Sequence, residues 1–262
     1  MKLNRYVFVW SLCLCSMPAL AQVDTIGKKG NTLLTNRLKP GLNQYLVYTQ
    51  NPKSSKKLGF WFWLRDIKRE NRNRENTITI SQQWFSADTL NYRKVFSKNR
   101  AANFAPLFHS ETVKGVVHAY NWYPDHIKGA DTVSNNTKKD FGLDFKSPNL
   151  NWNLDIETFE MLPLAAGKKF ALNFYDAGLD PPAYVLYQVT GDEVLTLYGN
   201  KTVDCWKLIT QGEHDRKPYS ETYWISKNDH QFLKEEDNFG GIFRFKIRMP
   251  DNSPNLLTRF TN

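Results

Sequence analysis

Apolar and polar residues alternate most clearly near the end of the chain, in the last strand-like segment. Its apolar residues are Phe243, Phe245, Ile247 and Met249, and its cationic residues between them are Arg244, Lys246 and Arg248. A period of two residues is typical of a β-strand with one apolar and one polar face. We expect Phe243, Phe245 and Ile247 to point into the core and the cationic side chains to point away from it.

Three more strands are predicted just before this segment, over residues 202–210, 219–227 and 230–237. Asn228 and Asp229 are expected to form a two-residue hairpin turn, because Asn and Asp tolerate the positive φ angles of such turns. Gly240 and Gly241 predict a looser turn before the last strand. The closing part of the chain is therefore expected to be four antiparallel strands.

The same pattern upstream raises the expected total to about ten strands, among them residues 44–50, 58–64, 76–85 and 111–122. One short helix is predicted over residues 156–162, with Asp155 as its N-cap and Pro163 at its end. Strands joined by short connections favour a single, strongly twisted antiparallel sheet. The expected fold is mostly β: a half-barrel or open barrel whose concave apolar face the helix covers.

The first 21 residues have the pattern of a secretory signal peptide. Lys2 and Arg5 precede a short apolar run over residues 6–17, and Ala19-Leu20-Ala21 precede the expected cleavage site. A lipoprotein signal with Cys15 as the lipidated residue is the alternative, although such signals usually have a small residue where Leu14 stands. Export to the periplasm or outer cell envelope follows. Residues 22–40 are expected to be a loose lead-in and residues 41–262 a single antiparallel β domain, without a transmembrane segment.

If the protein is exported, its net charge and its cysteine count must be interpreted without residues 1–21. Removing residues 1–21 takes away Lys2 and Arg5 and lowers the net charge from +9 to +7. In an exported protein this excess indicates anionic lipid head groups or acidic glycans rather than nucleic acid, or serves solubility alone. Only Cys205 remains, so no intramolecular disulfide can form, and we expect it to be a small buried apolar residue.

The second half of the chain resembles a family. The features that carry the resemblance are a short helix opened near Asp155, the run Val203-Asp204-Cys205-Trp206-Lys207-Leu208, and the series Trp224-Ile225-Ser226-Lys227, Glu235-Glu236-Asp237 and Gly240-Gly241. This series resembles the exported bacterial family called domain of unknown function 3108, and is also similar to the last strands of Lol-type periplasmic lipoprotein carriers. The resemblance covers residues 155–250 well. It implies a curved sheet, a helical lid, an exported protein and, for the Lol type, acyl-chain binding; it implies no catalytic residues.

Candidate chemistry is sparse. The histidines have no i, i+4 spacing, so neither a metal nor another cofactor is predicted. The acids of the helix are explained by capping and the helix dipole, and those of the closing strands by cross-strand pairing; they are Asp155, Glu157, Glu160, Asp204, Glu235, Glu236 and Asp237. No phosphate-binding loop or nucleophile elbow is visible. We therefore expect a protein that is not an enzyme, with a glycan hydrolase as the third-ranked alternative.

The aromatic run Phe60-Trp61-Phe62-Trp63 is the main candidate for ligand contact. Alternate residues of a strand face opposite sides, so both faces need burial: either another element covers one pair or that pair lines a ligand cavity. We place the ligand between the sheet and the helix. The predicted contacts are Trp61, Trp63, Ile156, Phe159 and Leu162.

The predicted function is that of a cell-envelope carrier or binding protein for an apolar or amphiphilic ligand, with lipid as one candidate. The alternative is an envelope scaffold that contacts protein or polysaccharide.

Overall fold

The structure is a computed structural model that describes residues 22–27, 32–54, 58–72, 75–86, 92–214, 216–256 and 258. The predicted signal peptide and Cys15 lie outside the described residues. In the described part, sixteen strands form a single sheet. The strands are β1 (Val23–Thr25), β2 (Gly41–Gln50), β3 (Leu58–Arg72), β4 (Glu75–Ser86), β5 (Arg93–Arg100), β6 (Pro106–Val113), β7 (Val116–Trp122), β8 (His126–Gly129), β9 (Gly142–Asp144), β10 (Leu150–Asn151), β11 (Lys169–Tyr175), β12 (Ala183–Thr196), β13 (Thr202–His214), β14 (Lys217–Ser226), β15 (Phe232–Phe239) and β16 (Ile242–Arg248).

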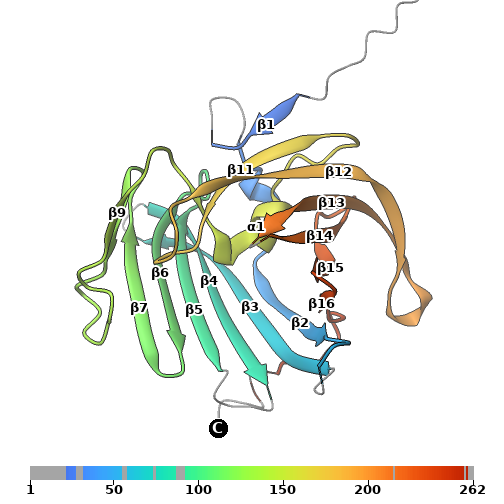
Figure 1. Cartoon of the computed structure of the whole chain (residues 1–262), viewed down its shortest axis with the longest axis horizontal. Helices are drawn as coiled ribbons and strands as arrows, with labels where there is room; N and C mark the ends of the chain where they lie inside the picture. The colour runs from blue at the N-terminus through green and yellow to red at the C-terminus, as the bar shows by residue number, and fades with distance from the viewer. Residues whose placement is uncertain are drawn as a thin grey trace, which may run out of the picture.

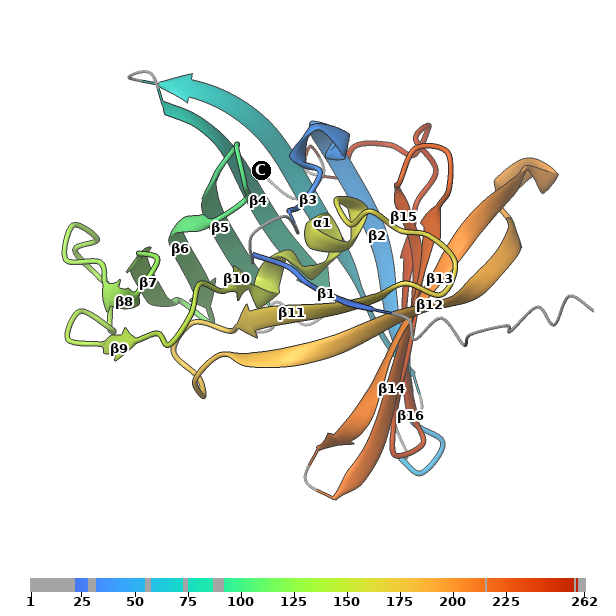
Figure 2. The same ribbon diagram turned by 90° about the horizontal axis from the view of Figure 1, so that it is seen from above.

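The sheet runs in the order β1-β11-β12-β13-β14-β15-β16-β2-β3-β4-β5-β6-β7-β8-β9, with β10 also paired to β11. Only β1 and β10 pair in parallel, both with β11; the other pairs are antiparallel. The two ends of this order, β1 and β9, are not hydrogen-bonded to each other, so the sheet is curled but open (Figures 1 and 2). The predicted fold class is confirmed, and the strand count of about ten was too low.

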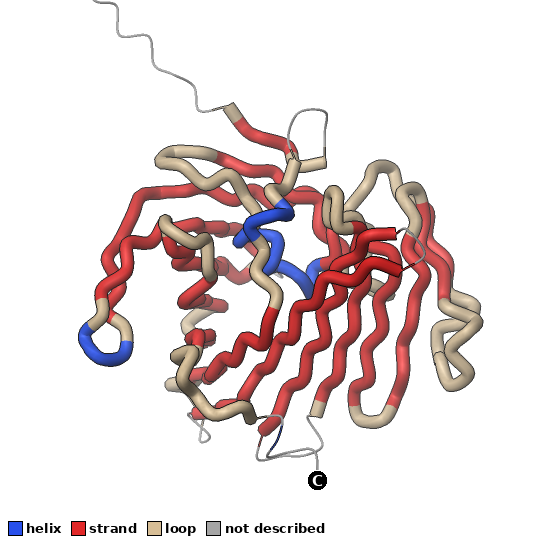
Figure 3. Tube along the Cα trace, turned by 180° about the vertical axis from the view of Figure 1, so that it is seen from behind, coloured by secondary structure: helices blue, strands red, loops and turns tan. Residues whose placement is uncertain are grey.

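Short helical turns accompany the sheet (Figure 3). They are the 3-10 turns η1 (Thr35–Arg37), η3 (Trp152–Leu154) and η4 (Tyr198–Asn200) and the helix α1 (Asp155–Glu160), which lies inside the curl of the sheet (Figure 1). The helix is shorter than predicted. Asp155 is its first residue rather than its N-cap, and the Asp155 carboxylate accepts the Ile156 N–H at 2.8 Å. Asn151 caps the preceding turn instead, where its side-chain oxygen accepts the Asn153 N–H at 3.0 Å.

The last strand, β16, was predicted with its faces inverted. Lys246 is buried, with 3% exposure, while Phe243, Phe245 and Ile247 are only half-buried on the convex side. Lys246 pairs across the strands with Glu235 and packs over the ring of Trp63, so its charge is compensated inside the curl. The alternation was right, but the direction was wrong.

Other local expectations also change. The connection between β14 and β15 spans residues 227–231 instead of a two-residue turn, and His230 takes the positive φ of 57°. Where the structure describes residues 22–40, they are packed against the sheet rather than loose: β1 pairs with β11, and Ile26, Leu33 and Leu38 are buried.

The loop around residue 136 has a buried centre, because Asn136 is 6% exposed. Asn136 donates to the Ala119 and Ala130 carbonyls and accepts from the Ala119 and Lys138 N–H groups. Its side chain thus stands in for missing strand pairing.

Candidate functional site

The tryptophans of the aromatic run face the inside of the curl. Trp63 is buried and donates its indole N–H to the Gln82 side chain at 3.1 Å, and Trp61 stacks on Trp84 with ring centroids 6.3 Å apart. Phe60, on the opposite face, is 53% exposed. The sheet therefore orients the pair that we favoured inward.

The predicted helix contacts lie in the same apolar cluster as Trp63. Ile156, Phe159 and Leu162 are completely buried in it. The ring of Phe159 lies 4.6 Å from that of Tyr223 and 4.9 Å from that of Tyr187. The structure thus brings the five predicted site residues together, with Trp61 half-buried against the cluster, as parts of a packed core.

A buried ion pair fixes α1 to the sheet. The Arg65 guanidinium, on β3, donates from Nε to Glu157 Oε1 at 2.7 Å and from Nη2 to the second Glu157 oxygen and to the Asn153 carbonyl. Both side chains are buried. Removing one partner of such a pair leaves an uncompensated buried charge. The Arg65–Glu157 pair therefore opposes movement of α1 away from β3.

The end of the helix carries a second buried acid. Glu160 Oε1 accepts the Phe232 N–H at 2.9 Å, at the start of β15. Burial, with the neighbouring Glu157 charge, raises the pKa of the Glu160 carboxyl to about 8. Glu160 therefore keeps its proton in the folded protein at neutral pH.

Ser97 and His109 resemble a nucleophile with its general base, but both side chains are buried away from solvent. The Ser97 hydroxyl and the Asn151 amide lie 3.0 Å from His109 Nδ1. Ser97 and His109 are 0% and 1% exposed, and burial lowers the pKa of His109 to about 4. A substrate has no access to this pair, which acts as a buried polar network.

Two of the four closing-strand carboxylates, Glu235 and Asp237, pair across the strands with β16 as predicted, whereas Glu236 pairs with Lys234 of its own strand. Arg244 donates to Asp237 at 2.6 Å and to Glu235 at 3.1 Å, and Lys246 binds the other Glu235 oxygen. Burial and the adjacent Glu235 charge raise the pKa of Asp237; against burial, Lys246 and Arg244 hold the pKa of Glu235 low. These acids serve charge compensation on the concave face.

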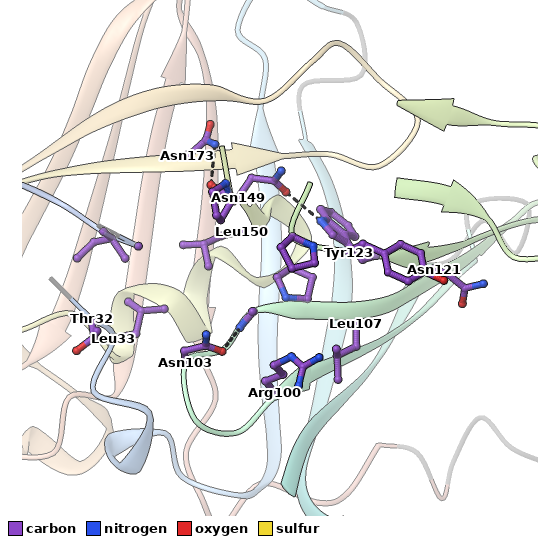
Figure 4. A pocket seen from close by; sticks show the side chains of 17 residues that line it. Thr32, Leu33, Arg100, Asn103, Leu107, Asn121, Tyr123, Asn149, Leu150 and Asn173 are labelled. Carbon is purple, nitrogen blue, oxygen red and sulfur yellow. Dashed lines mark hydrogen bonds between the residues drawn. The ribbon is translucent and has the colours of Figure 1, made fainter. Parts of the chain in front are cut away.

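A pocket of about 430 Å³ lies elsewhere, beside the ends of β6 and β7 and the segment that leads into β10 (Figure 4). None of the five predicted contacts lines it. Its wall is largely apolar and includes Ile26, Leu33, Pro106, Leu107, Trp122 and Leu150. A pocket of this size, apolar with a few polar groups, is typical of small-ligand sites.

The polar groups that the described residues bring to the pocket are mostly amides, with one cation and no carboxylate. Arg100 carries the charge, and the asparagines are Asn103, Asn121, Asn149 and Asn173. Asn149 is 7% exposed; its Oδ1 accepts the Trp122 indole N–H at 3.0 Å, while its buried Nδ2 has no protein partner. A buried donor without a partner costs free energy. Because the Nδ2 atom is shielded, a ligand acceptor would have to displace a neighbouring group to reach it.

A second, more open pocket of about 470 Å³ shares Asn121 and Tyr123 with the first. It has a polar wall that includes Lys128 and Lys139. In the described part of the chain, no group of three or more His, Cys, Asp or Glu side chains could hold a metal ion. Nor do the described residues form a helix long and apolar enough to cross a membrane.

Fold and pocket together define an open, β-barrel-like protein with a small apolar cavity. The chain belongs to the DUF3108 family of proteins of unknown function, whose profile matches residues 44–248. A search of curated protein sequences finds no match.

Among solved structures, the β-barrel-like protein of domain of unknown function DUF1849 from Brucella abortus is similar with a TM-score of 0.52 and 10% identity, over 80% of this chain and 97% of that one. At this identity the likeness shows the fold alone. The hypothetical lipoprotein YmcC from Escherichia coli (TM-score 0.32, 12% identity, 81% and 88% covered) and a Bacteroides fragilis protein with a YmcC-like fold (0.35, 9%, 80% and 94%) are more distant. The likeness to Lol-type carriers stays a prediction.

Proposed function

We propose that the protein is an exported binding or carrier protein of the cell envelope, without catalytic activity, and that it holds a small amphiphilic ligand in the 430 Å³ pocket. The observation that carries this proposal is the combination of an apolar wall with the unpaired amide of Asn149. Export rests on the signal-peptide pattern of residues 1–21.

The charge of the wall narrows the ligand class. Among the described residues of the wall, Arg100 is the only ionised side chain, and its guanidinium lies 3.7 Å from Glu75, which leaves it weakly compensated. Because no carboxylate stands among the described residues of the wall, an anionic or neutral acceptor group is favoured over a cationic one. A carboxylate or phosphate on an apolar chain fits both features, so lipids and fatty acids are the leading candidates.

Native mass spectrometry of the mature protein, purified gently from the envelope fraction, tests the proposal. We expect a co-purified amphiphile whose occupancy is lost in Leu107→Trp, which fills the pocket. Leu186→Trp is the matched control, because Leu186 is 52% exposed on β12 and lies outside the pocket wall. Two outcomes would contradict the proposal. One is a ligand that stays bound in Leu107→Trp, and the other is folded wild-type protein that binds none of the amphiphiles offered.

A further inference from the structure

One end of the sheet exposes large apolar side chains from neighbouring hairpins. Leu58 and Phe60 of β3 are 55% and 53% exposed, and Ile242 and Phe239 at the turn between β15 and β16 are 41% and 39% exposed. We call these four residues the tip surface. Large apolar side chains left exposed at one end of a fold can mark an interaction site.

The strand register places these residues at the same end. Gln50, the last residue of β2, pairs with Leu58 on one side and with Phe243 on the other. Ile242 pairs with Phe239, which pairs with Tyr219 near the start of β14. The ends of β14 and β16 project together at the lower edge of Figure 2.

Both faces of the sheet are apolar at this end. The side chain of Phe60 lies on the convex face, opposite to that of Trp61. Phe239 is two residues from Asp237 on β15, and Ile242 is two residues from Arg244 on β16, so both lie on the concave face. A flat protein partner would cover the apolar residues of one face and leave those of the other face exposed to solvent. A lipid layer can surround both faces of a projecting edge, and aromatic and aliphatic side chains favour the head-group boundary.

Positive charge near the tip surface also favours a lipid bilayer as the partner. The sequence from Thr49 to Phe60 contains three lysines and no acidic residue, and Lys53 is exposed. Arg216 and Lys217, at the hairpin between β13 and β14, are also exposed. The nearby sequence positions Glu213 and Asp215 are acidic, so this hairpin adds no net positive charge. An exposed lysine beside exposed apolar residues favours contact with the surface of an anionic membrane.

We propose that the tip surface docks on an anionic phospholipid bilayer, with Leu58, Phe60, Phe239 and Ile242 entering the head-group region and Lys53 adjoining the lipid phosphates. This docking site is separate from the pocket, because none of its residues lines the pocket wall. It would deliver a carrier to the surface that holds amphiphiles, but it does not depend on the pocket's having a ligand.

Co-sedimentation of the mature protein with vesicles tests this docking. The vesicles are phosphatidylcholine alone, or phosphatidylcholine with about 30% phosphatidylglycerol, a bilayer with a negative surface potential. We expect binding to the anionic vesicles that weakens as salt rises from about 0.05 to 0.5 M, because the Debye length shortens. Phe60→Ser and Leu58→Ser should each weaken partitioning about tenfold through lost apolar burial.

The matched control is Val194→Ser, since Val194 is an exposed apolar residue (58%) on β12, away from the tip. It should bind like wild type, and circular dichroism should show all variants folded. Absence of binding to anionic vesicles, or equal binding by Phe60→Ser, would overturn the proposal. So would a concentration-dependent dimer of the wild type that Phe60→Ser abolishes, because the tip would then be a contact between copies.

Discussion

The ammonium group of Lys246 lies 4.4 Å from the centroid of the Trp63 ring, inside the curl of the sheet. Lys246 is 3% exposed and also binds Glu235. A cation, an indole and a carboxylate thus share the concave face, where an apolar strand face was expected. Desolvated contacts of this kind are worth more than exposed ones.

The first prediction follows from this contact. Lys246→Ala should lower the free energy of unfolding by about 3–5 kcal/mol, because it leaves Glu235 buried with part of its compensation removed. Phe245→Ala should cost less, about 1–2 kcal/mol, since Phe245 is half-buried on the convex face. Lys234→Ala, which removes a more exposed pair with Glu236, should cost under about 1 kcal/mol. Urea denaturation measures all three, and a larger loss for Phe245→Ala than for Lys246→Ala would contradict this orientation of β16.

The second prediction concerns the anchor of α1. Arg65→Met should cost about 3–5 kcal/mol, because Glu157 stays buried without its partner. The double variant Arg65→Met/Glu157→Met should be more stable than Arg65→Met alone, since the fully buried Glu157 charge is then no longer left unpaired; Asp155, 3.7 Å from Arg65, loses the same partner in both variants. A double-mutant cycle in urea gives the coupling directly. Strictly additive losses would show that the two side chains act independently.

The third prediction is a pH dependence. The pKa of Glu160 is about 8 in the folded protein against an ordinary value of 4.5. As pH rises from about 4.5 to 8, the unfolded chain loses this proton while the folded chain keeps it, so this group makes stability fall with pH across that window. Glu160→Gln keeps an oxygen for the Phe232 N–H and removes the titration. Its unfolding free energy should therefore vary less over this window than that of wild type.

The control for this titration is Glu236→Gln, at an outward-facing carboxylate on β15 that pairs with Lys234. Its stability profile should keep the slope of the wild type. Parallel profiles for wild type and Glu160→Gln would mean that Glu160 is ionised in the folded state.

The sequence was sufficient for the fold class, because a period of two residues recurs along most of the chain. It was insufficient for the direction of β16, since alternation defines two faces but not which one is buried. A usable signal was present: Glu235 and Asp237 are two residues apart on one side of the glycine turn, and Arg244 and Lys246 on the other. A hairpin across that turn places opposite charges face to face, and compensated charges can then be buried.

The pocket had no comparable signal. Its wall combines the lead-in at Leu33, the turn before β6, the end of β7 and the segment before β10. These segments are strand ends and connections that are distant in the sequence, so no single stretch of the chain marks the pocket. The aromatic run was expected to need burial on both faces. Its tryptophan side is packed into the core, where the helix residues account for the burial, but Phe60 is 53% exposed, so the expectation was wrong for the phenylalanine side.

The pocket is expected to hold an acidic or neutral amphiphile. Calorimetric titration with decanoate measures this binding, on wild type, Asn149→Asp, Leu107→Trp and the core variant Trp61→Ala. We expect saturable wild-type binding of one decanoate per chain. Asn149→Asp keeps the acceptor for Trp122 but replaces the free donor with a negative charge, so its binding should be at least about tenfold weaker. Leu107→Trp should abolish binding, and folded Trp61→Ala should retain it. Undiminished binding in Asn149→Asp and Leu107→Trp, together with loss in Trp61→Ala, would contradict the account and return the ligand to the space between the helix and the sheet.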